Sequence, residues 1–484
     1  MRLSQLASGY EIHPHGADPD VTAITEDSRR VAPGTLFVAV PGTSLDGHRY
    51  IGDAAARGAV AIAAERGGFV PSPLAEVRVT SSRKALAEFA ARFYDFPAAA
   101  LEVIGFTGTF GKTSTSEILR ALLDAGGGRT GVLGSLGGRY GSFREPSTGL
   151  TTPAPVELHK ALRGLRDAGA SSVVLEVTSH ALRLDRVHGL TFGGGLLAAI
   201  MAGEHTDFHR SYEDYVSAKR LFLDHLQADA VLAYDADNQA ARRLAAEARV
   251  ATRAGFSLEA REAYLQFHDV VVDSRGAAFG VTGQFDGGGS AARLHSSLLG
   301  RGHLRNVSLA LAYAFATGVP VAAARDVLAS LSPLRRRMER YEVDGRTVLD
   351  DTAAHPDSFT AAFDVAAMLP HDDLVVVYAL RGSRGAEINR VNARALADLL
   401  TIHGVSSFVA TASDDGTAGK DRATAEEIDA TRQALAERGA RFVWHDSLRA
   451  AVREAMDRSG PGDLIVLVGA QGMDGAKALL SEDR

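Results

Sequence analysis

A glycine-rich segment that ends in lysine and threonine is the part of this sequence best suited to chemistry. Residues 107–115 read TGTFGKTST. Glycines in such a loop let backbone N–H groups close on phosphate oxygens, and the N-terminus of a following helix adds partial positive charge. Lys112 would then reach the β- and γ-phosphates of a nucleotide, and the Thr113 hydroxyl would hold Mg²⁺. An ordinary glycine-rich turn is the alternative, but it does not account for Gly-Lys-Thr at this place.

The flanking residues predict the strand and the helix that the loop needs. The apolar run 101–106 reads as a buried strand, and residues 116–123 place apolar side chains at helical spacing. Strand, glycine loop, lysine with a hydroxyl, and helix is the order of a phosphate-binding loop. The sequence therefore predicts a site for a nucleotide and Mg²⁺.

Acidic and imidazole side chains downstream could complete a metal site. Glu176 stands near the end of the apolar strand predicted at 172–177, and open α/β sheets bind ligands at the carboxyl ends of strands. A structural carboxylate at a strand end is equally compatible with this position. His205 and His209 are four residues apart and could both ligate metal, although such a cluster also occurs in solvated turns.

A helix predicted over residues 212–226 adds a lysine on the same face as a tyrosine. Tyr215 and Lys219 are spaced i and i+4, so their side chains are neighbours on the helix surface. A helical lysine is usually a surface charge, so this signal is weak alone. Together with the phosphate loop, these residues supply several kinds of Mg²⁺ ligand in one domain.

The 484 residues divide into three predicted α/β domains, 1–98, 99–331 and 332–484. In the middle domain, buried strands alternate with helices, which predicts a mostly parallel sheet that carries the loop. Residues 262–298 are predicted to append antiparallel strands to it. The third domain alternates strands and helices in the same way, which predicts a second, Rossmann-like doubly wound sheet.

Composition excludes several classes of function. Lys and Arg number 52 against 59 Asp and Glu, a net charge of −7, so no global basic field would recruit nucleic acid. Cysteine is absent, which excludes disulfides, Cys-ligated metals and thiol catalysis. No signal peptide and no apolar run of about 18 residues is apparent. We therefore expect no membrane partner and a cytoplasmic location, where ATP is available.

Four motifs in order resemble those of the Mur ligase family. They read T-G-T-x-G-K-T, E-V-T-S-H, E-H-T-D-F-H and Y-x-x-A-K and lie within residues 107–219. In the first domain, D-S-R, P-G-T-L-F and D-G-H resemble the UDP-sugar domain of the members that add the third residue of the peptidoglycan stem peptide. The resemblance spans nearly the whole chain and is most specific in the middle domain. It implies a first domain for the UDP-sugar, a central ATP-binding domain and a Rossmann-like third domain for the amino acid.

The resemblance also implies an activity. A Mur-type ligase would use ATP and Mg²⁺ to join an amino acid to UDP-N-acetylmuramoyl-L-alanyl-D-glutamate through an acyl phosphate, in peptidoglycan synthesis. It would act as a monomer, with Lys219 carbamylated by CO₂. Carbamylation needs the neutral amine, so we expect burial or nearby cations to depress the pKa of Lys219.

Individual roles follow from the resemblance in the same way. Catalysis would depend on Lys112, Glu176, His205 and Lys219. ATP would contact Gly108, Thr109, Gly111, Lys112, Thr113, Ser114, Asn306, Arg337 and Asp351. Mg²⁺ would bind Thr113, Glu176, His205 and carbamylated Lys219. The acceptor would bind Ser28, Thr151, Thr152, Ser179 and Arg186. Arg384 is a candidate for the α-carboxylate of the amino acid, because arginine suits bidentate contacts with carboxylates; a surface salt bridge is the alternative.

Several positions depart from the family pattern. Phe110 and Leu150 each stand where these ligases usually have Asn, and Ala354 replaces a histidine of the third domain. Asp414 and Asp415 occupy the place of an Asp-Asn-Pro-Arg motif whose arginine grips the distal carboxylate of diaminopimelate. Diaminopimelate is therefore disfavoured, and lysine or ornithine fits the two carboxylates, unless these lie in a solvated loop. A ligase for another carboxylate, or a nucleotide-binding protein with a decayed site, are the alternatives.

Overall fold

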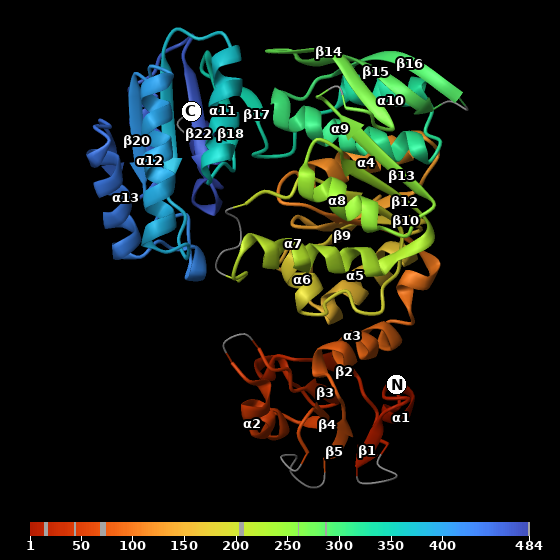
Figure 1. Cartoon of the computed structure of the whole chain (residues 1–484). Coiled ribbons are helices and arrows are strands. Elements are labelled where there is room, and N and C mark those ends of the chain that lie inside the picture. The colour runs from red at the N-terminus through yellow and green to blue at the C-terminus, as the bar shows by residue number, and fades with distance from the viewer. Residues whose placement is uncertain are drawn as a thin grey trace. The chain divides into compact units, whose positions relative to one another are not determined.

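The computed structural model describes residues 1–13, 18–42, 45–67, 74–202, 208–259, 261–285 and 288–482 (Figure 1). It contains three sheets, of five, eleven and six strands, with helices between many of the successive strands. The predicted α/β class is confirmed. The chain separates into two compact units, one made of Met1–Gln266, Gly283–Ser290 and Leu309–Ala323, and the other of Phe267–Thr282, Ala291–Ser308 and Ala324–Arg484.

The first sheet lies within residues 11–78 and has the order β1-β5-β4-β3-β2. Its strands are β1 (Glu11–His13), β2 (Ala23–Thr25), β3 (Thr35–Val38), β4 (Ala59–Ala64) and β5 (Ala75–Arg78). They are parallel except β1, which pairs antiparallel with β5. Helix α1 (Leu3–Leu6) precedes β1, the connecting helices are η1 (Ser28–Arg30), η2 (Gly47–Tyr50) and α2 (Ile51–Ala56), and α3 (Ser82–Phe93) follows β5. All four residues of β3 are buried, as expected for a central strand with a core on both faces.

The second sheet carries the predicted phosphate loop after its central strand. Its order is β16-β15-β14-β13-β12-β11-β6-β10-β7-β8-β9. The parallel strands are β6 (Glu102–Thr107), β7 (Thr130–Gly134), β10 (Ser172–Glu176), β11 (Phe192–Leu197), β12 (Leu226–Asp235) and β13 (Thr252–Ser257). A Cβ at Gly105 of β6 would lie 2.7 Å from ring carbons of Phe192 and Phe222. Glycine in the middle of this strand therefore makes room for the aromatic core beside the loop.

The outer strands of this sheet are β8 (Gly137–Tyr140), β9 (Phe143–Glu145), β14 (Leu265–Asp273), β15 (Gly276–Phe285) and β16 (Gly288–Ser296). The helices are η3 (Pro97–Ala100), α4 (Lys112–Ala125), α5 (Pro155–Asp167), α6 (Ser179–Arg183), α7 (Tyr212–Arg220), η4 (Leu221–His225), α8 (Gln239–Glu247), α9 (Gly300–Ala316) and α10 (Val321–Ser330). The helix predicted over 212–226 is shorter than expected. It ends as an α-helix at Arg220 because Leu226 already pairs with β11 as the first residue of β12.

The third sheet is doubly wound, as predicted. Its order is β17-β18-β22-β19-β20-β21, with β17 (Glu339–Val343), β18 (Arg346–Asp351), β19 (Leu374–Ala379), β20 (Ser407–Thr411), β21 (Val443–His445) and β22 (Leu464–Gly469). Helices α11 (Pro356–Met368), α12 (Ala386–Ile402) and α13 (Ala425–Glu437) contribute to one apolar cluster with this sheet. Helices α14 (Leu448–Asp457) and α15 (Ala476–Glu482) contribute to another, on the opposite face. The turns η5 (Gly419–Asp421) and η6 (Gln471–Met473) complete the elements.

The predicted domain boundaries, at 98/99 and 331/332, both fall between sheets. Within the part of the chain that the structure describes, none of the helices is both long enough and apolar enough to cross a membrane.

Candidate active site

The predicted strand, loop and helix are all present around residues 107–115. Helix α4 begins at Lys112, directly after a loop that leaves the carboxyl end of β6. Gly111 adopts a left-handed conformation (φ +78°) at the N-cap of α4, which glycine adopts without strain. A Cβ at Gly108 would lie 2.6 Å from the Cβ of Ala198, so a larger residue would push the loop away from its neighbour. Ser114 is buried in the first turn of the helix.

Two lysines meet at one carbonyl oxygen of this loop. The Nζ of Lys112 donates to the carbonyl oxygens of Gly108 (2.9 Å) and Thr109 (3.1 Å). The Nζ of Lys219, from α7, donates to the same Gly108 oxygen (2.9 Å) and to the Thr107 hydroxyl (3.3 Å). Lys219 is 1% exposed, and burial, reinforced by the charge of Lys112, lowers the pKa of Lys219 well below its usual value. The expected depression of this pKa is thus present.

The side chain of Tyr215 lies on the same face of α7 as Lys219, as the i, i+4 spacing predicts, and it also contacts the phosphate loop. Its hydroxyl lies 3.1 Å from the Oγ1 of Thr109, and its ring centroid lies 4.8 Å from the Nζ of Lys219. The backbone N–H of Met201 donates to the same Thr109 hydroxyl oxygen at 2.9 Å. Helix α7 is therefore fixed to the phosphate loop by two side chains one turn apart. By contrast, the side chain of Phe110 is 41% exposed.

Glu176 reaches the loop from the neighbouring strand. It ends β10, which pairs in parallel with β6, and it is 2% exposed. Its Oε2 accepts hydrogen bonds from the hydroxyls of Thr113 (3.1 Å) and Ser135 (3.2 Å), and its Oε1 accepts one from the Ser135 N–H (3.2 Å). Burial raises the pKa of Glu176, while Lys112 and these hydrogen bonds oppose the rise. A Cβ at Gly134 would lie 2.1 Å from its Oε1, so glycine there leaves room for the carboxylate.

The hydroxyl of Thr113 and the carboxylate of Glu176 fit the predicted Mg²⁺. Mg²⁺ is usually held by one or two protein carboxylates together with substrate phosphates and water, and these two oxygens are 3.1 Å apart beside the loop. His205 lies outside the described residues. Among the residues that the structure does describe, three or more His, Asp or Glu side chains are nowhere grouped as a metal site.

A cavity of about 670 Å³ lies within the same compact unit. Its lining comes from the first sheet and from the middle sheet and includes two of the predicted acceptor residues, Ser28 and Arg186. Arg29, Arg57 and Arg83 also line the cavity, together with Glu26, Leu150 and further residues. Burial lowers the pKa of Arg186 and raises that of Glu26. The lining has four arginines against three carboxylates, Glu26, Asp27 and Asp53, beside apolar side chains. This small excess of positive charge suits an anionic ligand that also has uncharged parts.

The other predicted acceptor residues are not part of the cavity lining. Thr151 Oγ1 is 3.0 Å from the Ser135 hydroxyl and so connects to the Glu176 network. Thr152 is fully buried, and its hydroxyl donates to the Glu176 carbonyl oxygen at 3.0 Å. The hydroxyl of Ser179, 1% exposed, lies 2.9 Å from the Nε2 of His209. The cavity lining includes none of Thr151, Thr152 and Ser179.

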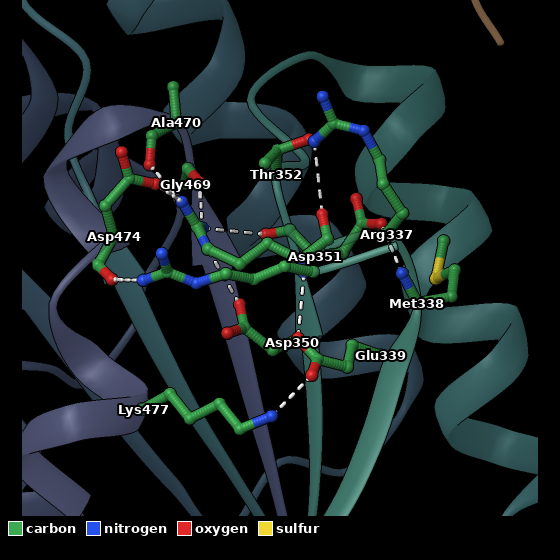
Figure 2. A network of polar contacts seen from close by, with 12 residues as sticks. Arg337, Met338, Glu339, Asp350, Asp351, Thr352, Gly469, Ala470, Asp474 and Lys477 are labelled. Carbon is green, nitrogen blue, oxygen red and sulfur yellow. Dashed lines mark hydrogen bonds and ion pairs between the residues drawn. The ribbon is translucent and has the colours of Figure 1, made fainter. Parts of the chain in front are cut away.

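Three residues that are predicted to bind the nucleotide belong to the second compact unit. Asn306 is half-buried on α9. Asp351 ends β18, its Oδ2 accepts a hydrogen bond from the Met338 N–H at 2.8 Å, and burial raises its pKa to about 6. Arg337 donates from Nη1 to the Thr352 hydroxyl and to the carbonyl oxygen of the preceding residue (Figure 2).

The residues expected to hold the amino acid already make hydrogen bonds within the domain of the third sheet. The Asp415 carboxylate accepts hydrogen bonds from the N–H groups of Leu448 (2.6 Å) and Arg449 (3.2 Å), at the start of α14. Asp414 Oδ1 lies 3.3 Å from the Nε of Arg422. Arg384 precedes α12, and its backbone N–H donates to Glu427 Oε1 at 2.9 Å. Asp415 thus accepts the first two N–H groups of α14, in addition to the N-cap residue Ser447, which neither interpretation of this loop anticipated.

Ser135 was missed in the sequence. The rule that singled out Glu176, a polar residue at the carboxyl end of a buried parallel strand, applies equally to a serine directly after β7.

Comparison with known proteins gives the family. The model of the Mur ligase middle domain matches residues 106–314, that of the Mur ligase, glutamate ligase domain matches 336–471, and that of the Mur ligase family, catalytic domain matches 20–94. A UDP-N-acetylmuramoyl-L-alanyl-D-glutamate--2,6-diaminopimelate ligase from Chlorobaculum tepidum is 34% identical over 469 residues, 94% of this chain and 88% of that protein. A UDP-N-acetylmuramyl-tripeptide synthetase from Roseiflexus sp. is 32% identical over 491 residues, covering 97% and 94%.

Solved structures share the fold. A MurF ligase from Thermotoga maritima in complex with ADP matches with a TM-score of 0.64 and 21% identity, over 96% of this chain and 98% of that chain. A UDP-N-acetylmuramoylalanyl-D-glutamyl-2,6-diaminopimelate--D-alanyl-D-alanyl ligase from Acinetobacter baumannii matches with a TM-score of 0.67 and 19% identity, over 99% and 98%. Matches to all three domain models, and relatives above 30% identity over nearly the full chain, establish that this chain belongs to the Mur ligase family of ATP-dependent, amide-forming ligases.

Proposed function

We propose that this protein adds an amino acid to UDP-N-acetylmuramoyl-L-alanyl-D-glutamate in peptidoglycan synthesis. The observation that carries this proposal is the Thr113–Glu176 hydrogen bond beside two lysines on a glycine-rich loop. The arginine-lined cavity in the same unit supports it, because a UDP-sugar is anionic and bulky.

The proposed reaction has two steps. A carboxylate oxygen of the acceptor attacks the γ-phosphorus of ATP, ADP leaves, and an acyl phosphate forms. The amine nitrogen of the amino acid then attacks the acyl carbon, loses a proton and expels inorganic phosphate, which leaves the amide. The protein contributes mainly position and charge, as in other phosphoryl transfers.

The residues divide this work between them. Lys112 exchanges its carbonyl partners for phosphate oxygens and offsets the repulsion between two anionic substrates. Thr113 and Glu176 would hold Mg²⁺, which supplies further neutralisation of the phosphates. Lys219, whose pKa is lowered by burial, would react with CO₂ as the neutral amine and become a carbamate anion.

For the amino acid we propose lysine or ornithine. The stretch that carries an arginine for a distal carboxylate in diaminopimelate ligases has Asp414 and Asp415 instead. Asp415 accepts hydrogen bonds at the start of α14, so the argument for a cationic side chain rests on the missing arginine and on Asp414. The relatives from Chlorobaculum tepidum and from Pseudomonas putida bear the name of diaminopimelate ligases, which makes diaminopimelate the second candidate.

Turnover with a panel of amino acids tests both the proposed acceptor and the proposed amino acid. Phosphate release from ATP is measured with UDP-N-acetylmuramoyl-L-alanyl-D-glutamate and lysine, ornithine or diaminopimelate, and the product is identified by mass spectrometry. We expect a product with lysine or ornithine. A diaminopimelate product would overturn the choice of amino acid alone. If no phosphate is released with this acceptor but another carboxylate supports turnover, the proposed acceptor is wrong. If no carboxylate supports phosphate release, the site has lost its activity.

A further inference from the structure

The carboxyl ends of β18 and β22 meet at a topological switch point of the third sheet. These strands are neighbours in the sheet, yet β18 leads to α11 on one face and β22 leads to α15 on the opposite face. Connections that diverge in this way leave a crevice outside the strand ends, and open α/β sheets bind ligands there. Asp351 and Gly469 are the last residues of the two strands.

A buried arginine, Arg336, bridges these two strand ends. Every N–H of its guanidinium group has an acceptor, and Figure 2 shows how the acceptors gather from both strands. The contacts are Asp350 Oδ1 (3.0 Å from Nε), the Ala470 carbonyl and Asp474 Oδ1 (2.7 and 2.6 Å from Nη1), and the Asp351 and Gly469 carbonyls (3.2 and 2.5 Å from Nη2).

This arrangement contributes little to the free energy of unfolding. Arg336 and Asp350 are 3% and 0% exposed, and burying two charges loses hydration that their attraction only partly offsets. Oδ2 of Asp350 is buried without a hydrogen bond. In addition, Arg336 has a left-handed backbone (φ +55°), which residues other than glycine adopt at a cost. A role in placing other groups explains these costs better than stability does.

The groups that Arg336 places belong to Asp351 and Arg337, two of the residues predicted to bind the nucleotide. Its Nη2 fixes the carbonyl of Asp351, while the next two residues along the chain complete the attachment. Arg337 donates to the Arg336 carbonyl oxygen and to the Thr352 hydroxyl, and the Met338 N–H donates to the Asp351 carboxylate. The segment 336–338 and the end of β18 therefore move as one piece, with its position set by β22.

We propose that Arg336 is a positioning residue for ATP: it holds Asp351 and Arg337 at the switch point in the orientation that the nucleotide requires. The inference rests on the proposed ligase function for the identity of the ligand. Without the guanidinium, the segment 336–338 would no longer be tied to the end of β22.

Arg336→Lys tests the proposal, with Arg346→Lys as the matched control. Arg346 lies at the opposite, amino-terminal end of the same β18, where its guanidinium donates to the Ser459 hydroxyl (2.9 Å) and to the carbonyl oxygens of Ser459 (2.6 Å) and Met456 (3.3 Å). Both variants lose a multiply bonded guanidinium and should melt at lower temperature. Only Arg336→Lys should raise KM for ATP, by about tenfold, because a small misplacement of binding groups is costly. Equal KM values in the two variants would show that Arg336 is merely structural.

Chemical rescue gives a second, independent result. Arg336→Gly suits the left-handed backbone and leaves a space of the shape of the lost group. Added guanidinium chloride, at concentrations that do not unfold the protein, should lower KM for ATP again in this variant and not in Arg346→Gly. Failure of rescue in a folded Arg336→Gly protein would contradict the proposal.

Equilibrium binding of a non-hydrolysable ATP analogue separates this inference from the proposed function. If the wild-type protein binds the analogue but turns over no acceptor, the proposed function fails while the comparison of Arg336→Lys with Arg346→Lys still decides the role of Arg336. Weaker binding in Arg336→Lys alone supports the positioning role, and equal binding in the two variants refutes it.

Discussion

At the scale of single residues, the environment of Lys219 determines its chemistry. The side chain is buried, its Nζ shares the Gly108 carbonyl oxygen with Lys112, and both its burial and the charge of Lys112 lower its pKa. A neutral amine is a nucleophile, whereas an ammonium ion is not. The lowered pKa of Lys219 favours the neutral amine that the proposed reaction with CO₂ needs.

Lys219→Ala should lose nearly all ligase activity, because the proposed carbamate, which would fix Mg²⁺, could not form. A small carboxylate such as formate should restore part of the activity by entering the space left by the side chain. The measurement is phosphate release with and without added formate. Full activity in Lys219→Ala would remove the carbamate from the mechanism.

The stability of the wild-type protein should rise with pH in CO₂-free buffer, between the depressed pKa of Lys219 and the ordinary lysine value of about 10.4. In that window the unfolded chain binds a proton that the folded state does not, so raising the pH favours folding. Lys219→Met should lack this part of the slope and be more stable than the wild type near neutral pH. Urea unfolding at a series of pH values measures both; parallel curves for the two proteins would contradict the depressed pKa.

At the scale of elements, the position of Asp415 beside the start of α14 shows which groups its carboxylate contacts. Asp415 accepts two backbone N–H groups at the start of α14, where a carboxylate also interacts favourably with the helix dipole. Its position in the family pattern suggested recognition of an amino acid instead. The two roles differ in what they require of the side chain.

Asp415→Ala should lower the free energy of unfolding by about 1 kcal/mol, the usual effect of losing a helix cap. Asp415→Asn keeps one acceptor oxygen and so retains one of the two hydrogen bonds; it should lose less stability than Asp415→Ala and leave KM for the amino acid near that of the wild type. Chemical denaturation and steady-state kinetics on the two variants measure these effects. A raised KM for the amino acid in Asp415→Asn would instead assign the carboxylate to substrate recognition.

The sequence predicted the elements whose signal is local. The strand, loop and helix over 101–123 follow one another directly, and Tyr215 and Lys219 share a face because of helical spacing alone. Ser135 reaches Glu176 only because β7 pairs in parallel with β10, 41 residues away. Arg336 is one of three consecutive arginines, and only the pairing of β18 with β22 decides which of them is buried.

At the scale of the whole molecule, the cavity combines residues that are distant in sequence. Asp27–Arg29 in the first sheet's domain and Leu150 and Arg186 in the middle domain line one space of about 670 Å³. The phosphate loop contributes nothing to this lining. Binding of the acceptor and binding of ATP should therefore respond separately to substitutions.

Arg186→Met should raise KM for the UDP-sugar acceptor by about tenfold or more, because a charged hydrogen-bonding group in a largely buried site is lost. Affinity for ATP should stay near that of the wild type. Arg163→Met, which removes an exposed arginine from α5, is the control and should leave both values unchanged. Isothermal titration with each ligand measures the two affinities. A parallel loss of both would indicate that Arg186 supports the fold instead.

The guanidinium of Arg336 also joins the two ends of one domain. It connects the segment before the first strand of the third sheet to residues up to 138 positions later, after the last strand. Fraying of the carboxyl-terminal turn would therefore be transmitted at once to the entry of the domain, and neither end can detach while the other stays docked. Amide hydrogens near residues 336–338 and 469–474 should accordingly exchange with solvent in a single opening event rather than in two.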